Sequence, residues 1–349
     1  MEIKIRNFQF SLSLRKKSVD KIDTELTRML GIRYPIVMAP MFLVSNARMT
    51  IEAIKAGITG AIPALNYRGD AAFRKALDEI RKECDGPFGI NLIVNKSNIK
   101  LKEQLQTCLD YRVDYIITSL GSPQMVIDMC KQKAIKVFCD VIDEQFAKKV
   151  EAMGADAIIA VNSEAGGHAG PLSAGTLIPM LVNACKIPII SAGGVGRGDQ
   201  LIEKLEWGAC GASIGSPFIA SNEAEVSMEY KQAIVDYGAK DIVMTTKISG
   251  SPCTVINTPY VQQIGTKQNW LESFLNKNRS LKKYAKMLTF YKGMKALENA
   301  AFSATYKTVW CAGPSIEYVH SIRPVREIVE TMVQEYFAAK KKQLSFSEN

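Results

Sequence analysis

The sequence holds two histidines, and one of them, His168, stands in a glycine-rich run after an apolar stretch. Residues 162–171 read Asn-Ser-Glu-Ala-Gly-Gly-His-Ala-Gly-Pro, and the β-rich segment 155–161 precedes them. Imidazole titrates near neutral pH, so a histidine in this place suits proton transfer or stabilisation of a developing charge. Glycines also let the backbone approach a ligand closely. The alternative is a loop histidine that serves only the geometry of the turn.

Two further glycine-rich turns follow apolar strands, and their chemistry suits a phosphate group. Residues 191–198 read Ser-Ala-Gly-Gly-Val-Gly-Arg-Gly, and residues 214–217 read Ile-Gly-Ser-Pro. Backbone N–H groups in such turns, next to a helix N-terminus, bind phosphate without a charged side chain. We therefore predict a phosphorylated cofactor, held by a cradle of Gly193, Gly194, Gly215 and Ser216.

Small and polar residues at other strand ends extend the candidate site. Residues 38–41 read Met-Ala-Pro-Met, where Pro40 fixes an extended chain and we expect the neighbouring amides to face the ligand. Asn91 places an amide inside an apolar strand, and a buried amide must find hydrogen-bond partners. Asn91 either bonds to neighbouring backbone or contacts a polar heterocycle, and the sequence leaves both possibilities open.

Short β-branched runs alternate with amphipathic stretches from residue 34 onward, and these elements must position the glycine turns. Continuous apolar strands are typical of a parallel sheet that is buried on both faces. Strands are expected at residues 35–39, 58–62, 88–93, 115–118, 136–140, 157–161, 188–191 and 212–215. Helices are expected at residues 48–56, 71–84, 100–111, 123–131, 144–153, 176–184 and 198–207.

Eight such units in about 200 residues predict an α/β protein with a closed (β/α)8 TIM barrel, whose site lies at the carboxyl ends of the strands. An open doubly wound sheet would require a G-x-G-x-x-G turn after an early strand, and Ala-Pro-Met-Phe at residues 39–42 is no such turn. We expect an N-terminal extension over 1–24 and the barrel over 25–240. Residues 241–320 predict a mostly helical insertion or lid near the barrel mouth, with irregular or short β segments at 242–246 and 254–257 and a lysine-rich helix at 271–301. Residues 321–349 predict a closing helix and tail.

Bulk properties fit a folded enzyme and argue against several other classes of protein. Hydrophobic residues make up 47% of the chain and charged residues 23%. No apolar run reaches the roughly 20 residues of a membrane span, and no secretory leader is evident, so we expect a cytoplasmic protein. The net charge is +9, but no nucleic-acid recognition motif accompanies the lysines. Eight cysteines without a C-x-x-C pair and two distant histidines predict no metal site.

Taken together, these motifs resemble those of the nitronate monooxygenases, formerly called 2-nitropropane dioxygenases. The similar segments are residues 33–41, 87–92, 164–168, 191–195 and 215–216, and the resemblance extends more loosely to 309–329. The resemblance implies an FMN-dependent (β/α)8-barrel oxidoreductase. The same superfamily contains a flavin-dependent enoyl-acyl-carrier-protein reductase and an NADH:quinone reductase.

The resemblance implies that His168 is the active-site histidine and that FMN contacts follow the shared motifs. With the glycine turns included, the predicted FMN-binding residues are Ala39, Pro40, Met41, Asn91, Val161, Asn162, Gly166, Gly167, Gly193, Gly194, Ser213, Ile214, Gly215 and Ser216. Two departures from the family pattern fall around the substrate side. Val161 and Asn162 stand where the family usually has Gln-Gly, and Pro314 replaces a second glutamine. We expect Asn162 to supply the missing side-chain hydrogen bonds to the flavin.

Three functions are compatible with these residues. The leading hypothesis is oxidation of an alkyl nitronate or nitroalkane, with O2 as second substrate, to a carbonyl compound and nitrite. A competing hypothesis is NAD(P)H-dependent reduction of an enoyl thioester or a quinone through the same flavin. A flavin-binding protein without catalysis is the third; the two lost glutamines favour it and the retained His168 argues against it. The oligomeric state stays open, and we expect His320 to be a capping or surface residue.

Overall fold

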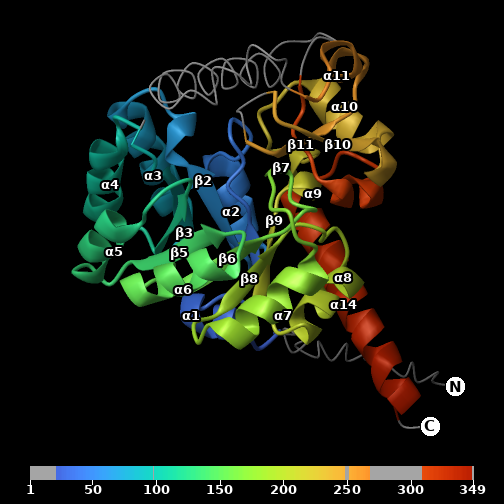
Figure 1. Cartoon of the computed structure of the whole chain (residues 1–349), viewed down its shortest axis with the longest axis horizontal. Helices are drawn as coiled ribbons and strands as arrows, with labels where there is room; N and C mark the ends of the chain where they lie inside the picture. Colours follow the sequence, from blue (N-terminus) through green and yellow to red (C-terminus); the bar gives the residue numbers. More distant parts are fainter. Residues whose placement is uncertain (1–20, 97, 248–250, 268–308, 348–349) are drawn as a thin grey trace, which may run out of the picture.

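In the computed structural model, which describes residues 21–96, 98–247, 251–267 and 309–347, the core is a closed barrel of eight parallel strands. The last strand pairs with the first, with Ile36 opposite Ala212, and this pairing closes the barrel. The predicted (β/α)8 barrel is confirmed (Figure 1). Its strands are β1 (Ile36–Met38), β2 (Thr59–Pro63), β3 (Phe88–Ile93), β4 (Tyr115–Ser119), β5 (Lys136–Val141), β6 (Ala157–Val161), β8 (Ile189–Ala192) and β9 (Gly211–Ile214).

Helices cover the outside of the barrel because each one has an apolar stripe to bury against the strands. In α3 (Asp70–Glu83) the predicted stripe of Phe73, Ala76, Leu77 and Ile80 is buried. The other outer helices that follow strands directly are α2 (Ala47–Lys55), α4 (Leu101–Asp110), α5 (Gln124–Lys131), α6 (Glu144–Met153), α7 (Ala174–Ala184) and α8 (Gly198–Glu206).

A long helix from the end of the chain completes the outer ring. This helix, α14 (Val325–Ser347), packs against both α8 and α2, and its C-terminal part runs out beyond the barrel in Figure 1. It lies within the predicted closing helix and tail at 321–349, but it begins at Val325, directly after Pro324, and not at residue 321. Among the described residues, no helix is both long and apolar enough for a membrane crossing.

The described residues between β9 and α14 gather at one side of the barrel (Figure 1). Strands β10 (Ile242–Thr245) and β11 (Cys253–Ile256) join the two-residue strand β7 (Gly167–His168) in an antiparallel sheet of order β10-β11-β7. The sequence indicates the first two strands, whereas β7 was not expected. The helical elements here are α9 (Ser216–Ile219), α10 (Met228–Asp236), α11 (Pro259–Ile264), and the 3-10 turns η2 (Ala239–Asp241) and η3 (Pro314–Tyr318). The whole of the predicted helix at 271–301 lies in the range 268–308, outside the described residues.

Large side chains fill the barrel interior at the amino-terminal side of the strands. The rings of Tyr115 and Phe138 stack with their centroids 4.9 Å apart, and the Tyr115 hydroxyl lies 3.0 Å from Thr59 Oγ1. Gly89 leaves room for this ring, since a Cβ at residue 89 would lie 2.1 Å from Tyr115 Cε2. Helix α1 (Glu25–Leu30) closes this end by packing Leu26 into the same cluster. Space for chemistry is therefore expected at the carboxyl ends of the strands.

Candidate functional site

Small and polar residues form the last inward-facing layer of the barrel. Side chains alternate along a strand, so the residues two positions beyond the buried interior layer also point inward. Those residues are Ala39, Pro63, Asn91, Ser119, Asp140, Val161, Ala192 and Ser213. The polar members at β3, β4 and β5 are adjacent, whereas the residues at β1, β6 and β8 are apolar. The barrel mouth therefore has polar side chains at β3, β4 and β5 and apolar side chains at β1, β6 and β8.

A chain of hydrogen bonds connects the polar residues of β3, β4 and β5. Asn91 Nδ2 donates to Ser119 Oγ over 2.7 Å, and Ser119 Oγ donates to Asp140 Oδ2 over 2.5 Å. Desolvation raises the pKa of Asp140 to about 6, although the bond from Ser119 works in the opposite direction. The polar side of the mouth therefore contains a carboxyl group whose charge changes in mildly acidic solution.

The structure allows both alternatives for Asn91, which were bonding to neighbouring backbone and contact with a polar ligand. Its Nδ2 also donates to the backbone oxygen of Ile117 over 3.2 Å, so both amide hydrogens are used within the barrel. Rotating the amide by half a turn would set its oxygen against the Ile117 carbonyl, which disfavours that orientation. Asn91 can therefore offer a ligand only its carbonyl oxygen, which is a hydrogen-bond acceptor.

Asp140 is a candidate functional residue that sequence reasoning missed. The sequence signal was present, because a carboxylate near the end of an otherwise apolar strand is costly unless it has partners. What the sequence lacks is the strand register that brings Asp140 beside Ser119.

The glycine turns after β6, β8 and β9 meet on the other side of the mouth. A Cβ on Gly166 would lie 2.8 Å from Ser216 Oγ, and a Cβ on Gly193 would lie 2.3 Å from Asn162 Oδ1. The segment around Gly313 closes the group, since its N–H donates to Ser216 Oγ over 2.8 Å. The structure thus brings together the three predicted turns and adds a fourth segment, in which Gly313 directly precedes Pro314, the residue that stands in place of the family's second glutamine.

The side chain of Asn162 has hydrogen-bond partners within the protein. Its side chain is 0% exposed, donates from Nδ2 to the Gly193 carbonyl over 3.2 Å, and accepts at Oδ1 from the Glu164 amide over 2.9 Å. These bonds connect the loop after β6 to the loop after β8. Direct hydrogen bonds from Asn162 to a flavin stay a prediction, which the burial of the side chain and its two bonds to backbone disfavour.

The amides after β1 also differ from expectation. The Ala39 N–H donates to the Ile214 carbonyl over 2.8 Å, and the Met41 N–H donates to Ser45 Oγ over 2.9 Å. Pro40 has no N–H, and the carbonyls of Ala39 and Met41 accept bonds from the protein, so the Pro40 carbonyl and the side-chain surface are what these three residues offer a ligand. The expectation that these amides face the ligand is corrected for this reason.

Three other predicted residues are placed by strand alternation. Val161 packs against the barrel interior, and Ser213 belongs to the inward layer. Ile214 points outward into the cluster beneath the helices, and its carbonyl is taken by Ala39. Ile214 therefore belongs to the closure of the barrel, and the neighbouring Ser213 is the residue whose side chain faces the mouth.

The predicted phosphate cradle retains the groups that such a ligand needs. Within the described residues, the N–H groups of Gly193, Gly194, Gly215 and Ser216 have no protein acceptor. Gly193 and Gly194 adopt positive φ angles of 113° and 76°, which glycine tolerates best. The Glu164 carboxylate lies against Gly194, where a Cβ would be 2.2 Å from Oε2, so a ligand reaches these glycines from the N–H side. These residues fit the phosphate of FMN.

His168 lies on β7, and the insertion holds this strand in place. His168 pairs with Cys253 and Gly167 with Thr254, while Thr254 Oγ1 donates to the Ala165 carbonyl over 2.5 Å. The imidazole is exposed to solvent, yet the surrounding protein removes part of its hydration. This desolvation lowers the pKa of His168 below its usual value, so the neutral form dominates at pH 7. Neutral imidazole can accept a proton.

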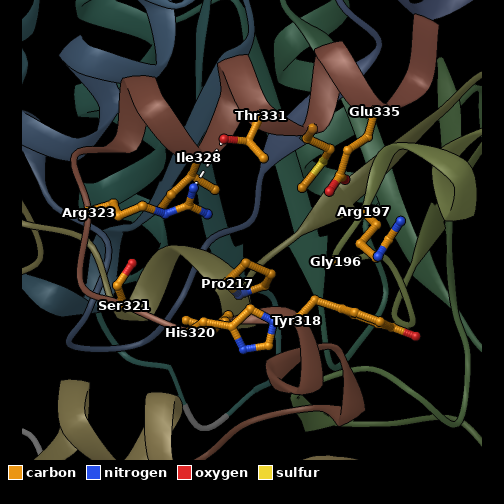
Figure 2. A pocket seen from close by; sticks show the side chains of 12 residues that line it. Gly196, Arg197, Pro217, Tyr318, His320, Ser321, Arg323, Ile328, Thr331 and Glu335 are labelled. Carbon is orange, nitrogen blue, oxygen red and sulfur yellow. Dashed lines mark hydrogen bonds between the residues drawn. The ribbon is translucent and has the colours of Figure 1, made fainter. Parts of the chain in front are cut away.

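A cavity of about 270 Å³ lies outside the barrel, between α14 and the loops after β8 and β9 (Figure 2). It is lined by Gly196, Arg197, Pro217, Tyr318, Val319, His320, Ser321, Arg323, Ile328, Thr331, Met332 and Glu335. The two arginines are already engaged, Arg197 with Asp199 and Arg323 with Thr331. His320 is exposed here, as expected of a surface residue. The described residues contain no cluster of three or more His, Cys, Asp or Glu side chains that could hold a metal ion.

Comparisons with known proteins agree with this geometry. A family model described as nitronate monooxygenase matches residues 97–335. A carboxyl-CoA dehydrogenase of Rhodococcus jostii, whose substrate is an octahydroindene, is 29% identical over 243 residues, which is 70% of this chain and 68% of the relative. A nitronate monooxygenase of Paraburkholderia phytofirmans is 29% identical over 271 residues, which is 64% of this chain and 74% of the relative.

Two solved structures are similar over nearly the whole chain. FabK from Thermotoga maritima superimposes with a TM-score of 0.82 at 26% identity, covering 93% of this chain and 100% of FabK. Nitroalkane oxidase from Streptomyces ansochromogenes has a TM-score of 0.76 at 22% identity, covering 91% of this chain and 99% of the oxidase. The second likeness concerns the fold alone.

Proposed function

The chain belongs to the nitronate monooxygenase family, and we propose that it is an FMN-dependent enzyme that oxidises alkyl nitronates or nitroalkanes with O2 to a carbonyl compound and nitrite. One observation carries this proposal. The glycine turns after β6, β8 and β9 meet around amides without protein acceptors, next to the short strand that carries His168. Because the chain is an enzyme of this oxidoreductase family, a flavin-binding role without catalysis is set aside.

The backbone side of the mouth would hold the cofactor. The amides of Gly193, Gly194, Gly215 and Ser216 would bind its phosphate, and the flat ring would lie over the mostly small side chains of the inward layer. Bound FMN supplies the redox chemistry, taking electrons from the substrate and passing them to O2. The carbonyl oxygen of Asn91 would accept a hydrogen bond from an N–H group of the ring or the substrate.

His168 would supply the proton chemistry. A nitroalkane becomes a nitronate by losing a proton from carbon, and a neutral imidazole is a suitable base. The lowered pKa of His168 keeps it neutral at pH 7. After it has taken the proton, the imidazolium would stabilise the anionic nitronate beside it.

Replacement of His168 tests the proposal. We expect His168→Ala to lower kcat for a nitroalkane about 10²–10⁴-fold, which is the usual contribution of a general base. The purified variant should remain yellow, because its phosphate cradle is unchanged. His320→Ala is the matched control, since His320 is the second histidine of the chain and lies in the cavity outside the barrel. A His168→Ala variant with wild-type turnover, or a wild-type protein that does not bind added FMN, would overturn the assignment.

A second candidate function is NAD(P)H-dependent reduction of an enoyl thioester or a quinone through the same flavin. It is favoured by the similarity to a carboxyl-CoA dehydrogenase and by the likeness to FabK over nearly the full chain. Anaerobic mixing separates the two candidates. Rapid bleaching of the bound flavin by NADH or NADPH supports the reductase, whereas bleaching by a nitronate alone supports the monooxygenase.

A further inference from the structure

Two cysteines that the proposed reaction does not use lie beside the strand of His168. Cys253 Sγ and Cys311 Sγ are 3.7 Å apart and share a hydrogen bond. All eight cysteines are free thiols within the described residues, and this is the one hydrogen bond between two of their sulfur atoms. A disulfide requires about 2.05 Å between its sulfur atoms, so the two thiols must move closer together before they can bond.

The strand register puts both thiols on the same face as the histidine. Cys253 is directly opposite His168, and Cys311 is opposite Val255 in an isolated antiparallel bridge. Because β10 occupies the other edge of β11, β7 and Cys311 lie in line along one edge. Opposite residues, and residues two apart on one strand, share a face of a sheet. The imidazole and both sulfur atoms are therefore on one face.

The two thiols differ in accessibility. Cys253 is 3% exposed and packs with Val255, Val261 and Val309, whereas Cys311 is half-buried. The hydrogen bond with Cys311 and burial together hold the pKa of Cys253 well above its usual value. Cys253 is thus a poor nucleophile toward molecules in solution, and Cys311 is the thiol that such a molecule can reach.

We propose that Cys253 and Cys311 form a redox-active dithiol, which a low-molecular-weight disulfide such as oxidised glutathione converts into an intramolecular disulfide beside His168. The Cys311 thiolate attacks one sulfur of the oxidised glutathione and releases one glutathione thiolate. The Cys253 thiolate then attacks Cys311 Sγ and releases the second. The protein loses two electrons and two protons, and these complete the two glutathione thiols.

Closure of this disulfide would act directly on the site. The Cys311 carbonyl accepts from the Tyr230 hydroxyl over 2.6 Å, and two residues later the Gly313 N–H donates to Ser216 Oγ. A covalent bond would therefore fix the segment that closes the glycine side of the mouth to the strand that faces His168. None of these steps involves FMN or a substrate, so the inference can be tested whether or not the proposed function holds.

Thiol counting on the wild-type protein tests the proposal without any substitution. Protein freed of reductant is incubated with oxidised glutathione, denatured, and labelled with N-ethylmaleimide for mass spectrometry. The reduced chain should take up eight labels, one for each cysteine. The oxidised chain should take up two fewer, with Cys253 and Cys311 in one linked peptide pair, and dithiothreitol should restore them. Retention of all eight labels, or loss of labels at a different pair, would overturn the proposal.

Single variants assign the order of attack. In Cys253→Ser, Cys311 should keep a stable glutathione adduct because no second thiol can displace it. In Cys311→Ser, Cys253 should react with neither glutathione nor another cysteine. Cys84→Ser is the matched control, since Cys84 is half-buried at the end of α3 and should leave the disulfide unaffected. A wild-type protein with a lasting adduct on Cys311 and a labelled Cys253 would contradict the resolving role of Cys253.

The two histidines provide an independent readout of the location. Imidazole signals in an NMR spectrum of histidine-labelled protein can be assigned with His320→Gln. Oxidation should shift the signal of His168, which is opposite Cys253, and leave that of His320 in place. An unchanged His168 signal in a fully oxidised sample would refute the placement of the disulfide beside the site.

Discussion

The two sides of the barrel mouth are built by different means. From β3 to β5 the mouth consists of side chains that hydrogen-bond to one another, and Asp140 contributes a charge that titrates. From β6 to β9 it consists of backbone, in loops packed so closely that a Cβ on Gly166 or Gly193 would collide with its neighbours. The two sides of the site therefore do different things. The side chains at β3–β5 (the side-chain half) set its charge and polarity, and the loops after β6, β8 and β9 (the backbone half) set its shape.

The most severe test of the backbone half is Gly193→Ala. Its Cβ would lie 2.3 Å from Asn162 Oδ1 and 2.5 Å from the Ala165 amide nitrogen, and φ at residue 193 is +113°. We expect a loss of about 3 kcal/mol or more in the free energy of unfolding, since overpacking and backbone strain add. Affinity for FMN should fall as well. Denaturant unfolding and fluorescence titration with FMN measure the two effects.

Gly31→Ala is the control for that variant. Gly31 also has a positive φ, of 69°, but nothing lies within 4 Å of its would-be Cβ. Gly31→Ala should therefore lower the free energy of unfolding by about 1 kcal/mol, through backbone strain alone. Equal losses in the two alanine variants would show that close packing of the loops is not what Gly193 provides.

The hydrogen bonds of Asn162 are expected to make the next largest contribution to stability in the backbone half of the mouth. Asn162→Ala leaves the Glu164 N–H and the Gly193 carbonyl without their partner, which should cost about 1–3 kcal/mol of stability. Asn162→Asp restores the acceptor for the Glu164 amide but not the donor, so it should recover only part of the loss. Thermal unfolding of the three proteins checks this order. Full stability of Asn162→Ala would contradict the role of Asn162 in connecting the loops.

Asp140→Asn tests the side-chain half. Unlike the variants above, it should raise the free energy of unfolding at pH 7. The pKa of Asp140 rises from 3.8 unfolded to about 6 folded, so the folded state binds the proton more tightly. Its contribution to stability is fully present below pH 3.8 and is lost as the pH rises through about 6. At pH 7 the uncharged asparagine should therefore stabilise the protein, on the order of 1–2 kcal/mol.

The pH dependence of unfolding provides the measurement for Asp140. The difference in stability between wild type and Asp140→Asn should change between about pH 4 and pH 6 and stay constant above that range. Asn91 should keep its orientation, since the asparagine at 140 still offers an oxygen to Ser119. A stability difference that does not vary with pH would show that Asp140 is not desolvated in solution.

The smallest effect is expected from Gly215→Ala. A Cβ at residue 215 would make ordinary contacts, 3.4 Å from Met41 Cγ and 3.5 Å from Ala39 Cβ, and its φ is −115°. Stability should change by no more than about 0.5 kcal/mol. A fall in FMN affinity at unchanged stability would support the approach of the phosphate to this amide. A large loss of stability would place Gly215 with the closely packed glycines instead.

The barrel and the glycine turns could be predicted from the sequence because their signals are local. Apolar runs such as 157–161 specify a buried strand, and Gly193–Gly194 at its neighbour's end specify a tight turn, whatever the rest of the chain does. The polar network could not be predicted, since it depends on the register that sets Ser119 beside Asp140. Strand β7 was missed for a similar reason: its two residues are extended only because Cys253 and Thr254 pair with them.

The pairing of β7 with β11 means that the surroundings of His168 depend on a part of the chain outside the barrel. The eight barrel strands are completed by residue 214, yet the neighbour of His168 comes from a hairpin encoded much later in the gene. Mutations in that hairpin can therefore alter the surroundings of the imidazole while the cofactor loops keep their sequence. A substitution in this peripheral ribbon can thus act on the imidazole while every strand of the barrel keeps its sequence.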